Sequence, residues 1–439
     1  MLTVPQSLDL ASQSRAASEA IVFGAVRLTY GELADRVSRL SAGLRELDVG
    51  TGDKVAVIMP NWPEALICLF AVVRSGAIAV LLNPRYRAFD AARVLRDARA
   101  KALIAPARIG PFDYLRMVVE LRPQLPDLQH VIAKDGIGDR VINLEQLLEC
   151  PRDELRDATA SPQEAEDRHV GQDATAPAVI LYTSGTTGEP KGALISHQAI
   201  TGGGRQLAEA LGIGELDVTL LVVPAFHAFG LACVASTLAA GGRLVLIDSA
   251  LKVTPILNAV RQEGVSILPG SPALFASLLA ILPEYGQDAL STVRMGLVAG
   301  APCSPALIRE FEQRFGLRLL NCYGTTELGA IASTRLDDPE TARAESVGRP
   351  LSGCEVRVVG DEGREAAPEQ IGEVLVRSEF GTLGYYGRPD LTAEAFAEGW
   401  YRTGDLGSIG AAGYLRLFGR KKELVKVGGF NVYPAEVEA

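Results

Sequence analysis

Two adjoining segments, Pro177-Ala-Val-Ile-Leu-Tyr182 and Thr183-Ser-Gly-Thr-Thr-Gly-Glu-Pro-Lys-Gly192, decide how the rest of the chain is interpreted. The first is a short apolar run, which is typical of a buried strand. The second is rich in hydroxyl groups and glycines and ends with a lysine. Hydroxyls and amides donate hydrogen bonds to phosphate oxygens, glycine lets the backbone come close, and lysine adds positive charge. The pattern predicts a strand that delivers a triphosphate-binding loop.

The loop is not a Walker loop, because Lys191 follows Pro190 and precedes Gly192 instead of standing in a Gly-Lys-Ser/Thr triplet. The alternative interpretation is a polar surface turn, which accounts for most short clusters of Gly, Ser and Thr. The apolar run before the loop favours the phosphate-binding interpretation.

Helix and strand signals alternate on both sides of the loop. Thr29-Tyr-Gly-Glu32 is a capping-box sequence with leucine and valine following at helical spacing, so a helix of about 15 residues is expected there. Residues 55–59 are expected to form a strand, 63–74 a helix and 77–82 a strand, the alternation of a parallel α/β sheet. A second αβ series is expected at 242–248, 254–263, 266–269 and 293–299.

Two other segments differ in texture. Residues 151–175 are rich in charge, Pro and Ala and are expected to form a solvent-exposed connection. After about residue 341 short alternating runs such as Glu355-Val-Arg-Val-Val-Gly360 and Gly372-Glu-Val-Leu-Val-Arg377 predict a small β-barrel or sheet subdomain.

Composition narrows the function classes. A chain of 439 residues with 48% hydrophobic residues is expected to form two or more lobes. The formal charge of −10 argues against a nucleic-acid surface. Six dispersed cysteines without a CxxC pair suit free thiols in a reducing cytoplasm, and the four histidines show no metal-ligand spacing.

No targeting or membrane segment is expected. Residues 1–20 lack a basic start and an apolar core, so they do not resemble a signal peptide. Residues 220–242 carry no charge, but Pro224, His227 and Gly230 interrupt them, and the segment fits strand, turn and buried helix better than a membrane span.

Four ordered motifs carry a resemblance to a known family. They are the loop at 183–192, Tyr323-Gly-Thr-Thr-Glu327, Tyr401-Arg-Thr-Gly-Asp405 and Gly419-Arg-Lys-Lys-Glu423. In this order and spacing the chain resembles the adenylate-forming superfamily, which includes acyl-CoA synthetases, luciferases and the adenylation domains of peptide synthetases. The resemblance runs from about Leu28 to the last residue.

The resemblance implies an α/β fold with two αβ subdomains of mostly parallel sheets and a small β-barrel subdomain. The large N-terminal domain would span 1–420, with αβ subdomains over about 1–340 and the barrel over about 341–420. Residues 421–439 would hold a hinge and the start of a C-terminal domain.

The resemblance also implies ATP and Mg²⁺ as cofactors. Glu327 would bind the metal, Thr326 the α-phosphate, Tyr323 would stack on adenine, and Asp405 with Arg420 would bind the ribose. Taken singly, Asp405 also fits a turn residue, Glu327 a carboxylate at a helix start and Tyr323 a core aromatic residue, but the joint pattern favours nucleotide binding. The expected nucleotide-binding residues are Thr183, Ser184, Gly185, Thr186, Thr187, Gly188, Lys191, Gly300, Ala301, Pro302, Asn321, Cys322, Tyr323, Gly324, Thr325, Thr326, Asp405 and Arg420.

Two lysines near the end of the chain are expected to serve the second half-reaction. Lys422 resembles the hinge about which the C-terminal domain turns, and Lys426 with Gly428-Gly429 resembles the segment that enters the site for thioester formation. Alone, Lys421-Lys422 fits a charged turn. The family's catalytic lysine is absent from the printed sequence, so we expect this stretch to bind ATP and acid but to adenylate poorly unless further chain or a partner supplies that residue.

His227 resembles the family's gate at the carboxylate site, although a lone histidine in an apolar run is more often a core residue. The residues expected to line the acyl pocket are small and mostly uncharged, which favours an aryl, alicyclic or medium-chain acid over malonate or an α-amino acid. They are His227, Ala228, Gly230, Cys233, Gly270, Ser271, Gly300, Ala301, Gly324 and Leu328.

The predicted reaction is acid plus ATP giving acyl-AMP and pyrophosphate, then CoA giving the thioester. The same first step would also suit transfer to a carrier-protein pantetheine or to an amine, and a binding module without turnover is the third alternative. The sequence does not choose the acid or the oligomeric state.

Overall fold

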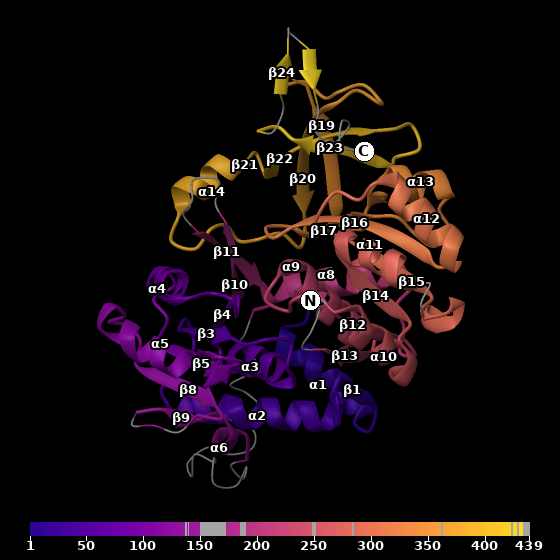
Figure 1. The fold of residues 1–439 in the computed structure, drawn as a ribbon. Helices are drawn as coiled ribbons and strands as arrows, with labels where there is room; N and C mark the ends of the chain where they lie inside the picture. The colour runs from indigo at the N-terminus through magenta and orange to yellow at the C-terminus, as the bar shows by residue number, and fades with distance from the viewer. Residues whose placement is uncertain are drawn as a thin grey trace. The chain divides into compact units, whose positions relative to one another are not determined.

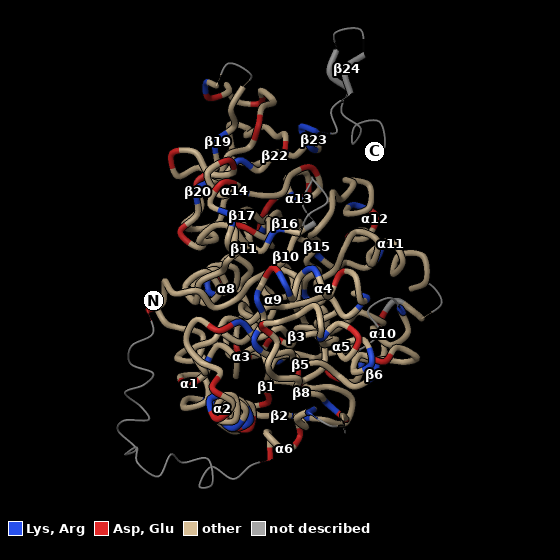
Figure 2. Tube along the Cα trace, turned by 90° about the vertical axis from the view of Figure 1, so that its left-hand side faces the viewer, with Lys and Arg blue, Asp and Glu red and all other residues tan. Residues whose placement is uncertain are grey.

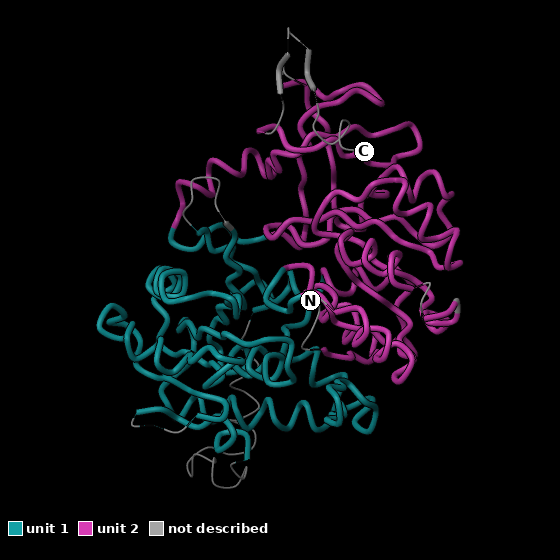
Figure 3. The backbone as a smooth tube through the Cα atoms, in the orientation of Figure 1, with its two compact units in different colours: residues 1–202, 224–227, 382–387 teal, residues 203–223, 228–381, 388–439 magenta. Residues whose placement is uncertain are grey.

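The computed structural model describes residues 1–136, 138, 140–149, 173–184, 190–247, 252–282, 285–360, 363–422, 425–427 and 430–432. Most of the expected connection at 151–175, and the glycines at 428–429, lie outside these residues. The chain divides into two compact units, 1–202 with 224–227 and 382–387, and 203–223 with 228–381 and 388–439 (Figure 3). We call them unit 1 and unit 2. Basic and acidic residues are interleaved along the described elements of both (Figure 2).

Unit 1 is built on a sheet of strand order β11-β10-β4-β3-β5-β8-β9, in which only the β10–β11 pair is antiparallel. Its elements are α1 (Val4–Arg15), β1 (Glu19–Phe23), β2 (Val26–Thr29), α2 (Tyr30–Glu46), β3 (Lys54–Ile58), α3 (Pro63–Arg74), β4 (Ile78–Leu82), α4 (Ala88–Asp97), β5 (Ala102–Pro106), β6 (Arg108–Ile109), β7 (Phe112–Asp113), α5 (Tyr114–Leu121), η1 (Arg122–Gln124), β8 (His130–Lys134), β9 (Ile142–Asn143), α6 (Leu144–Glu149), β10 (Pro177–Ser184) and β11 (Pro190–Ser196). Helix α8 (His197–Leu211) begins in unit 1 and continues into unit 2.

The local signals of unit 1 fold as expected. Thr29 and Glu32 form a complete capping box at the start of α2, and α3 occupies the predicted residues. Helix α3 is buried along nearly its whole length because it lies between α2 and the sheet strands β3 and β4. Helices α4 and α5 pack on the sheet through one apolar cluster that includes Leu95, Tyr114 and Met117.

Unit 2 has a second sheet, of order β18-β17-β16-β15-β14-β12-β13, with β13, β12, β14, β15 and β16 parallel (Figure 1). Its elements are β12 (Val218–Leu221), α9 (Ala228–Ala239), β13 (Arg243–Leu246), α10 (Val253–Glu263), β14 (Ile267–Gly270), α11 (Pro272–Ile281), η3 (Gln287–Leu290), β15 (Met295–Val298), α12 (Pro305–Phe315), β16 (Arg318–Thr325), β17 (Gly329–Ser333), α13 (Glu340–Glu345) and β18 (Arg349–Pro350). The predicted second αβ series is therefore confirmed.

The remaining part of unit 2 is antiparallel. Its elements are β19 (Cys354–Val359), β20 (Gly372–Ser378), α14 (Pro389–Ala395), β21 (Phe396–Ala397), β22 (Trp400–Ile409), β23 (Leu415–Arg420), β24 (Val425–Val427) and β25 (Phe430–Val432). The path β19-β20-β22-β21, with β23 beside β22, does not close on itself in the described residues. The expected small barrel is thus a curled half-barrel sheet, since its first and last strands do not pair.

The uncharged stretch at 220–242 folds as strand, turn and helix, as predicted. Strand β12 ends at Leu221, and the helix α9 that follows is 12 residues long. Among the described residues, no helix is long and apolar enough to cross a membrane.

Candidate functional site

The predicted phosphate loop joins the two strands of a hairpin in unit 1. Thr183 in β10 and Lys191 in β11 are paired across it, and the Thr183 hydroxyl donates to the Lys191 carbonyl at 3.5 Å. The structure therefore shows the residues on either side of the loop, Thr183 and Lys191, next to each other. The predicted residues Gly185, Thr186, Thr187 and Gly188, and the side chain of Ser184, lie outside the described part of the chain.

Lys191 is held from the side by a segment far away in sequence. Residues 382–387 run along β11, where the Tyr386 amide donates to the Gly192 carbonyl at 2.8 Å. This segment places the Tyr385 ring 5.6 Å from the Lys191 ammonium, within the range of a cation–π contact. The lysine is half-buried, so the contact constrains where its charge lies.

Gly192 has a packing reason as well. A Cβ there would lie 2.7 Å from Ile180 and 3.1 Å from the Tyr182 ring. The glycine that closes the motif is needed for the two strands to pack, whatever it does for a ligand.

His227 is the last residue of a turn at 224–227, which belongs to unit 1. Its amide donates to the Pro224 carbonyl, and the Ala225 amide donates to the Asn61 side chain at 2.9 Å. The His227 residue is exposed, but the protein around its ring lowers the pKa through desolvation. The ring is therefore neutral at pH 7 and able both to donate and to accept a hydrogen bond.

Several of the other predicted binding residues lie at one edge of the parallel sheet in unit 2. Gly270, Val298 and Asn321 are register partners across β14, β15 and β16, so the segments after these three strands emerge side by side. In parallel α/β sheets this carboxyl edge is where ligands bind. The predicted residues at this edge are Gly270, Ser271, Gly300, Ala301, Pro302, Asn321, Cys322, Tyr323, Gly324, Thr325 and Thr326.

Some of these residues make contacts that stabilise the fold. The Asn321 side chain donates to the Ser346 carbonyl at 3.1 Å, and burial raises the pKa of the Cys322 thiol to about 12, which makes it inert. A Cβ at Gly270 would lie 2.5 Å from Leu274, and one at Gly324 2.3 Å from the Gly329 carbonyl oxygen. Packing thus explains why both positions are occupied by glycine.

Gly300 differs from these two. Its φ of +86° lies in the left-handed region, and no atom lies within 4 Å of a Cβ built there. The backbone conformation, and not lack of room, requires glycine at this exposed position after β15.

Tyr323, Asp405 and Arg420 form one cluster. The Tyr323 hydroxyl donates to Asp405 Oδ2 at 2.5 Å, and Arg420 Nε lies 3.1 Å from Asp405 Oδ1. Asp405 and Arg420 are also register partners in β22 and β23. The tertiary structure therefore brings three residues from three predicted motifs together, as a shared nucleotide site requires. Burial and the Asp405 carboxylate raise the pKa of Tyr323 well above its usual value, so the phenol stays a donor.

Glu327 is buried in the turn after β16, two residues beyond Thr325, whose hydroxyl accepts from the Leu328 amide at 3.2 Å. Among the described residues, no group of three His, Cys, Asp or Glu could hold a metal ion. A single carboxylate fits Mg²⁺ that is bound mainly by nucleotide phosphates, since this ion takes one or two carboxylates and completes its shell with phosphate oxygens and water.

The predicted pocket residues of α9, and Leu328, are buried or half-buried. Cys233 and Leu328 are each 3% exposed, Gly230 is also buried, and Ala228 is half-buried. Burial raises the pKa of Cys233 above its usual range, with the nearby Cys322 adding to the shift. The acyl pocket stays a prediction.

The segment before the hinge is anchored to the half-barrel. The Lys421 amide donates to the Gly404 carbonyl, and its ammonium lies 2.9 Å from Glu373 Oε2. Burial alone would raise the pKa of Glu373, but hydrogen bonds from Arg402 and Lys421 outweigh it and lower the pKa. Lys422 is exposed, and Lys426 lies in β24, for which only the backbone is described.

The sequence analysis did not identify four residues that support the site: Asn61, Glu373, Tyr385 and Thr403, whose hydroxyl accepts from the Asp405 amide at 3.0 Å. Only Thr403 stood within a recognised motif. The other three lie far in sequence from their partners, so no local pattern marked them.

Comparison with known proteins identifies the family of the chain. The family described as AMP-binding enzyme matches residues 8–386. The chain is 31% identical to the mitochondrial medium-chain acyl-CoA ligase ACSF2 of Macaca fascicularis, covering 99% of this chain and 74% of that protein. It is 33% identical to a feruloyl-CoA synthase of an Amycolatopsis species, covering 95% and 79%.

Among solved structures, the anthranilate CoA ligase AuaEII in complex with anthranoyl-AMP superposes with a TM-score of 0.89 at 26% identity, covering all of this chain and 81% of that one. The family match, these relatives and the four motifs agree: the chain belongs to the AMP-binding enzymes of the adenylate-forming superfamily.

Proposed function

We propose that this chain is an AMP-forming acyl-CoA synthetase, which converts a carboxylic acid, ATP and CoA into an acyl-CoA through an acyl-AMP. The observation that carries the proposal is the Tyr323–Asp405–Arg420 cluster, because it unites three of the family motifs at one place. Relatives named as CoA ligases for medium-chain, feruloyl and anthranilate substrates support CoA as the acceptor and an aliphatic or aryl acid as the substrate.

Each side chain has a role that suits its setting. The Thr183–Lys191 hairpin would hold the β and γ phosphates with hydroxyls, amides and one ammonium group. Asp405 and Arg420 would hold the ribose, and Thr326 would donate to the α-phosphate. Neutral His227 would donate one hydrogen bond to the carboxylate without adding a positive charge to the site.

Mg²⁺, when bound, would neutralise the charge that develops as pyrophosphate leaves, and Glu327 is the residue that would hold it. The protein's own contribution is to fix the acid and the α-phosphorus in line. Lys422 as hinge and Lys426 as part of the thioester-forming segment remain proposals, as do ATP, Mg²⁺ and CoA as ligands and a cytoplasmic location.

The carboxyl edge of the sheet supplies residues that we propose to contact the acid. The exposed Gly300-Ala-Pro302 segment and Ser271 offer small side chains at the carboxyl edge of the sheet, which suits an aryl, alicyclic or medium-chain acid. Gly270 and Gly324 do not support a large pocket, because packing against neighbouring atoms already requires glycine at both positions.

The test is to incubate the chain, and a version that carries any native sequence beyond Ala439, with ATP, Mg²⁺ and a panel of carboxylic acids, with and without CoA. Mass spectrometry should show acyl-CoA and AMP. Acyl-AMP that persists until a carrier protein or an amine is added would replace CoA as the acceptor. ATP binding without any product in either version would support a binding module instead.

Two lysines of unit 1 supply a matched control. Lys191 lies 5.6 Å from the Tyr385 ring and Lys54 lies 5.9 Å from the Tyr386 ring, so Lys191→Met and Lys54→Met remove similar contacts. Only Lys191→Met should weaken ATP binding, by about tenfold for one lost charge-assisted contact. Equal affinities in both variants would contradict the phosphate role of Lys191.

A further inference from the structure

The hydroxyl of Tyr323 has a partner that a stacking role does not require. It donates to Asp405 Oδ2 at 2.5 Å, across 82 residues of sequence. The tyrosine ring packs in the apolar cluster of the half-barrel with Val374, Val376 and Tyr401, and the residue is 8% exposed. Phenylalanine would fill the same volume, so packing alone does not explain the hydroxyl.

Asp405 is fixed from several directions. Its amide donates to the Thr403 hydroxyl at 3.0 Å, and that hydroxyl donates to the Val374 carbonyl of β20 at 2.8 Å. Its two carboxylate oxygens receive different groups, the phenol at Oδ2 and the Arg420 guanidinium at Oδ1. Because each oxygen has a contact, the plane of the carboxylate is defined as well as its position.

These contacts are compatible with a ligand. A carboxylate oxygen accepts more than one hydrogen bond, so the phenol and the guanidinium do not use up the acceptor capacity of Asp405. Two neighbouring hydroxyls of a ribose are a matching pair of donors for two oxygens of one carboxylate. Orientation matters for such a pair, because both bonds form well only in one plane.

We propose that the Tyr323 hydroxyl is a positioning group for ribose recognition, which holds the Asp405 carboxylate in the plane that accepts both hydroxyls of the nucleotide's cis-diol. The inference rests on the proposed nucleotide site and adds a second role to Tyr323 beside the predicted stacking of its ring.

Tyr323→Phe separates the two roles, because it keeps the ring and removes the hydroxyl. Binding of ATP and of 2′,3′-dideoxyATP is measured by calorimetry on the wild-type chain and on the variant. We expect Tyr323→Phe to weaken ATP by about tenfold, the value of one hydrogen bond to a charged group, and to leave the affinity for dideoxyATP unchanged. An equal loss for both nucleotides, or no loss for either, overturns the proposal.

Tyr414→Phe is the matched control, since the Tyr414 hydroxyl also donates to a carboxylate of unit 2, Asp338 Oδ1, at 2.7 Å and lies in none of the predicted binding segments. It should not change the preference for ATP over dideoxyATP. In an Asp405→Asn background, Tyr323→Phe should cause little further loss of ATP affinity, because both changes act through one contact. Additive losses would contradict the role.

If Tyr323→Phe does not fold, Thr403→Val gives a second test. It leaves the tyrosine ring in place and removes the hydroxyl that holds the Asp405 amide and also bonds to the Tyr323 side chain, so it should again weaken ATP and spare dideoxyATP. Failure of the wild-type chain to bind ATP at all would refute the proposed function itself, whereas normal ATP binding without the selective losses would refute only the positioning role.

Discussion

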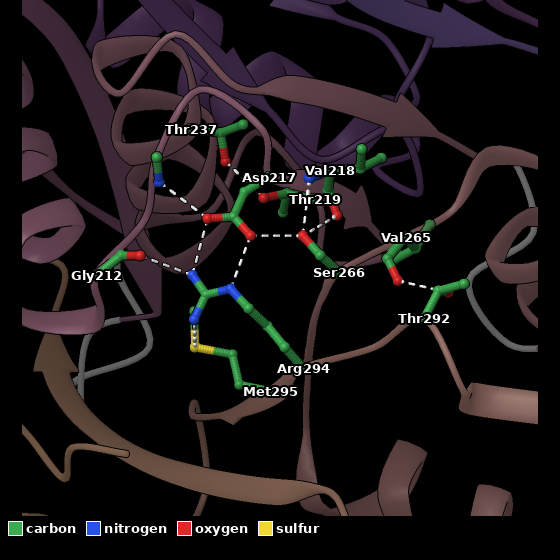
Figure 4. A network of polar contacts seen from close by, with 11 residues as sticks. Gly212, Asp217, Val218, Thr219, Thr237, Val265, Ser266, Thr292, Arg294 and Met295 are labelled. Carbon is green, nitrogen blue, oxygen red and sulfur yellow. Dashed lines mark hydrogen bonds and ion pairs between the residues drawn. The ribbon is translucent and has the colours of Figure 1, made fainter. Parts of the chain in front are cut away.

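The two ends of the parallel sheet in unit 2 are built in opposite ways. At the amino end, Asp217, Ser266 and Arg294 each stand one residue before the neighbouring strands β12, β14 and β15 and bond to one another (Figure 4). At the carboxyl end β14 leads into Ser271 and β15 into Ala299-Gly300-Ala301, whereas β12 leads into Val222. The amino end carries paired charges, and the carboxyl ends of β14 and β15 carry short side chains, of which Ser271 and Ala301 are exposed.

The network at the amino end of the sheet is centred on the Asp217 carboxylate. Arg294 contacts both oxygens of Asp217 at 2.8 Å, and the Gly214 amide and the Ser266 hydroxyl complete the set of donors. Desolvation alone would raise the pKa of Asp217, but hydrogen bonds from Arg294 and Ser266 lower it. Near the start of β16, Glu312 and Arg343 form a second, more deeply buried pair with 2.6 Å between Oε2 and Nη2.

The comparison teaches that charge in this unit has two uses. Where a charged group is bonded only to the fold, it stabilises the strand starts. Where its partners come from the predicted motifs, as at Asp405, we propose that it also binds a ligand. The two kinds of site should therefore fail in different assays.

The largest effect is expected from Arg343→Met. Arg343 and Glu312 have side chains only 3% and 7% exposed, so loss of the arginine leaves a buried carboxylate without its main partner. Removing one member of a buried pair costs about 3–5 kcal/mol of folding stability. Denaturant unfolding measures it, and the double change with Glu312→Gln should recover part of the loss. A variant as stable as the wild type would show that the amino end does not depend on charge pairing.

Glu327→Gln should act on turnover and not on stability. The amide keeps the shape but loses the charge that binds Mg²⁺, so Mg²⁺-dependent adenylation should fall about 100-fold. The measurement is acyl-AMP formation against Mg²⁺ concentration in a version that turns over, with thermal melting as the control for folding. Unchanged turnover would remove Glu327 from the metal site.

Asp405→Ala should weaken ATP binding by about thirtyfold, close to 2 kcal/mol, because it removes hydrogen bonds from the ribose to a charged acceptor. Calorimetry gives the dissociation constant. Asp217→Ala is the matched change at the opposite end of unit 2 and should lower stability while leaving nucleotide affinity in the folded protein unchanged. If Asp405→Ala lowered only stability and Asp217→Ala lowered ATP affinity, the distinction between structural and ligand-binding charges would be wrong.

The smallest effect is expected when the pH is lowered. It contrasts the paired charges with a buried histidine that stays neutral in the folded protein. In unit 1, His197 Nδ1 accepts from the Val4 amide at the start of α1 and is 2% exposed. Burial lowers the pKa of His197 to about 4. A histidine with a lowered folded pKa contributes stability that is present above its unfolded pKa, near 6.5, and is lost as pH falls toward 4.

At pH 5.5 the loss should be about 1 kcal/mol, and hydrogen exchange should show it first in residues 4–15. His197→Asn keeps an acceptor without a titration, so it should abolish the loss between pH 6.5 and 4. The Asp217 network should still weaken below about pH 4, since its lowered pKa makes its contribution vanish only there. Loss of α1 protection at the same pH in both proteins would contradict the role of His197.

The sequence by itself determined the local elements and the identity of the family. The capping box at Thr29, the bounds of α3 and the strand before the phosphate loop follow from side chains a few residues apart, because helix caps and apolar periodicity act over one or two turns. The four motifs identified the superfamily, and this resemblance supplied the predicted roles of residues such as Glu327 and Asp405.

Only the tertiary structure decided which residues meet. The Tyr323 hydroxyl meets Asp405, Arg294 meets Asp217 and Lys191 meets Tyr385 across 82, 77 and 194 residues, and no local pattern encodes such pairs. It also showed that Gly192 and Gly270 are small because a neighbouring side chain occupies the space, and that the β subdomain stays open. Strand order and register set these contacts, and they depend on the packing of the whole sheet at once.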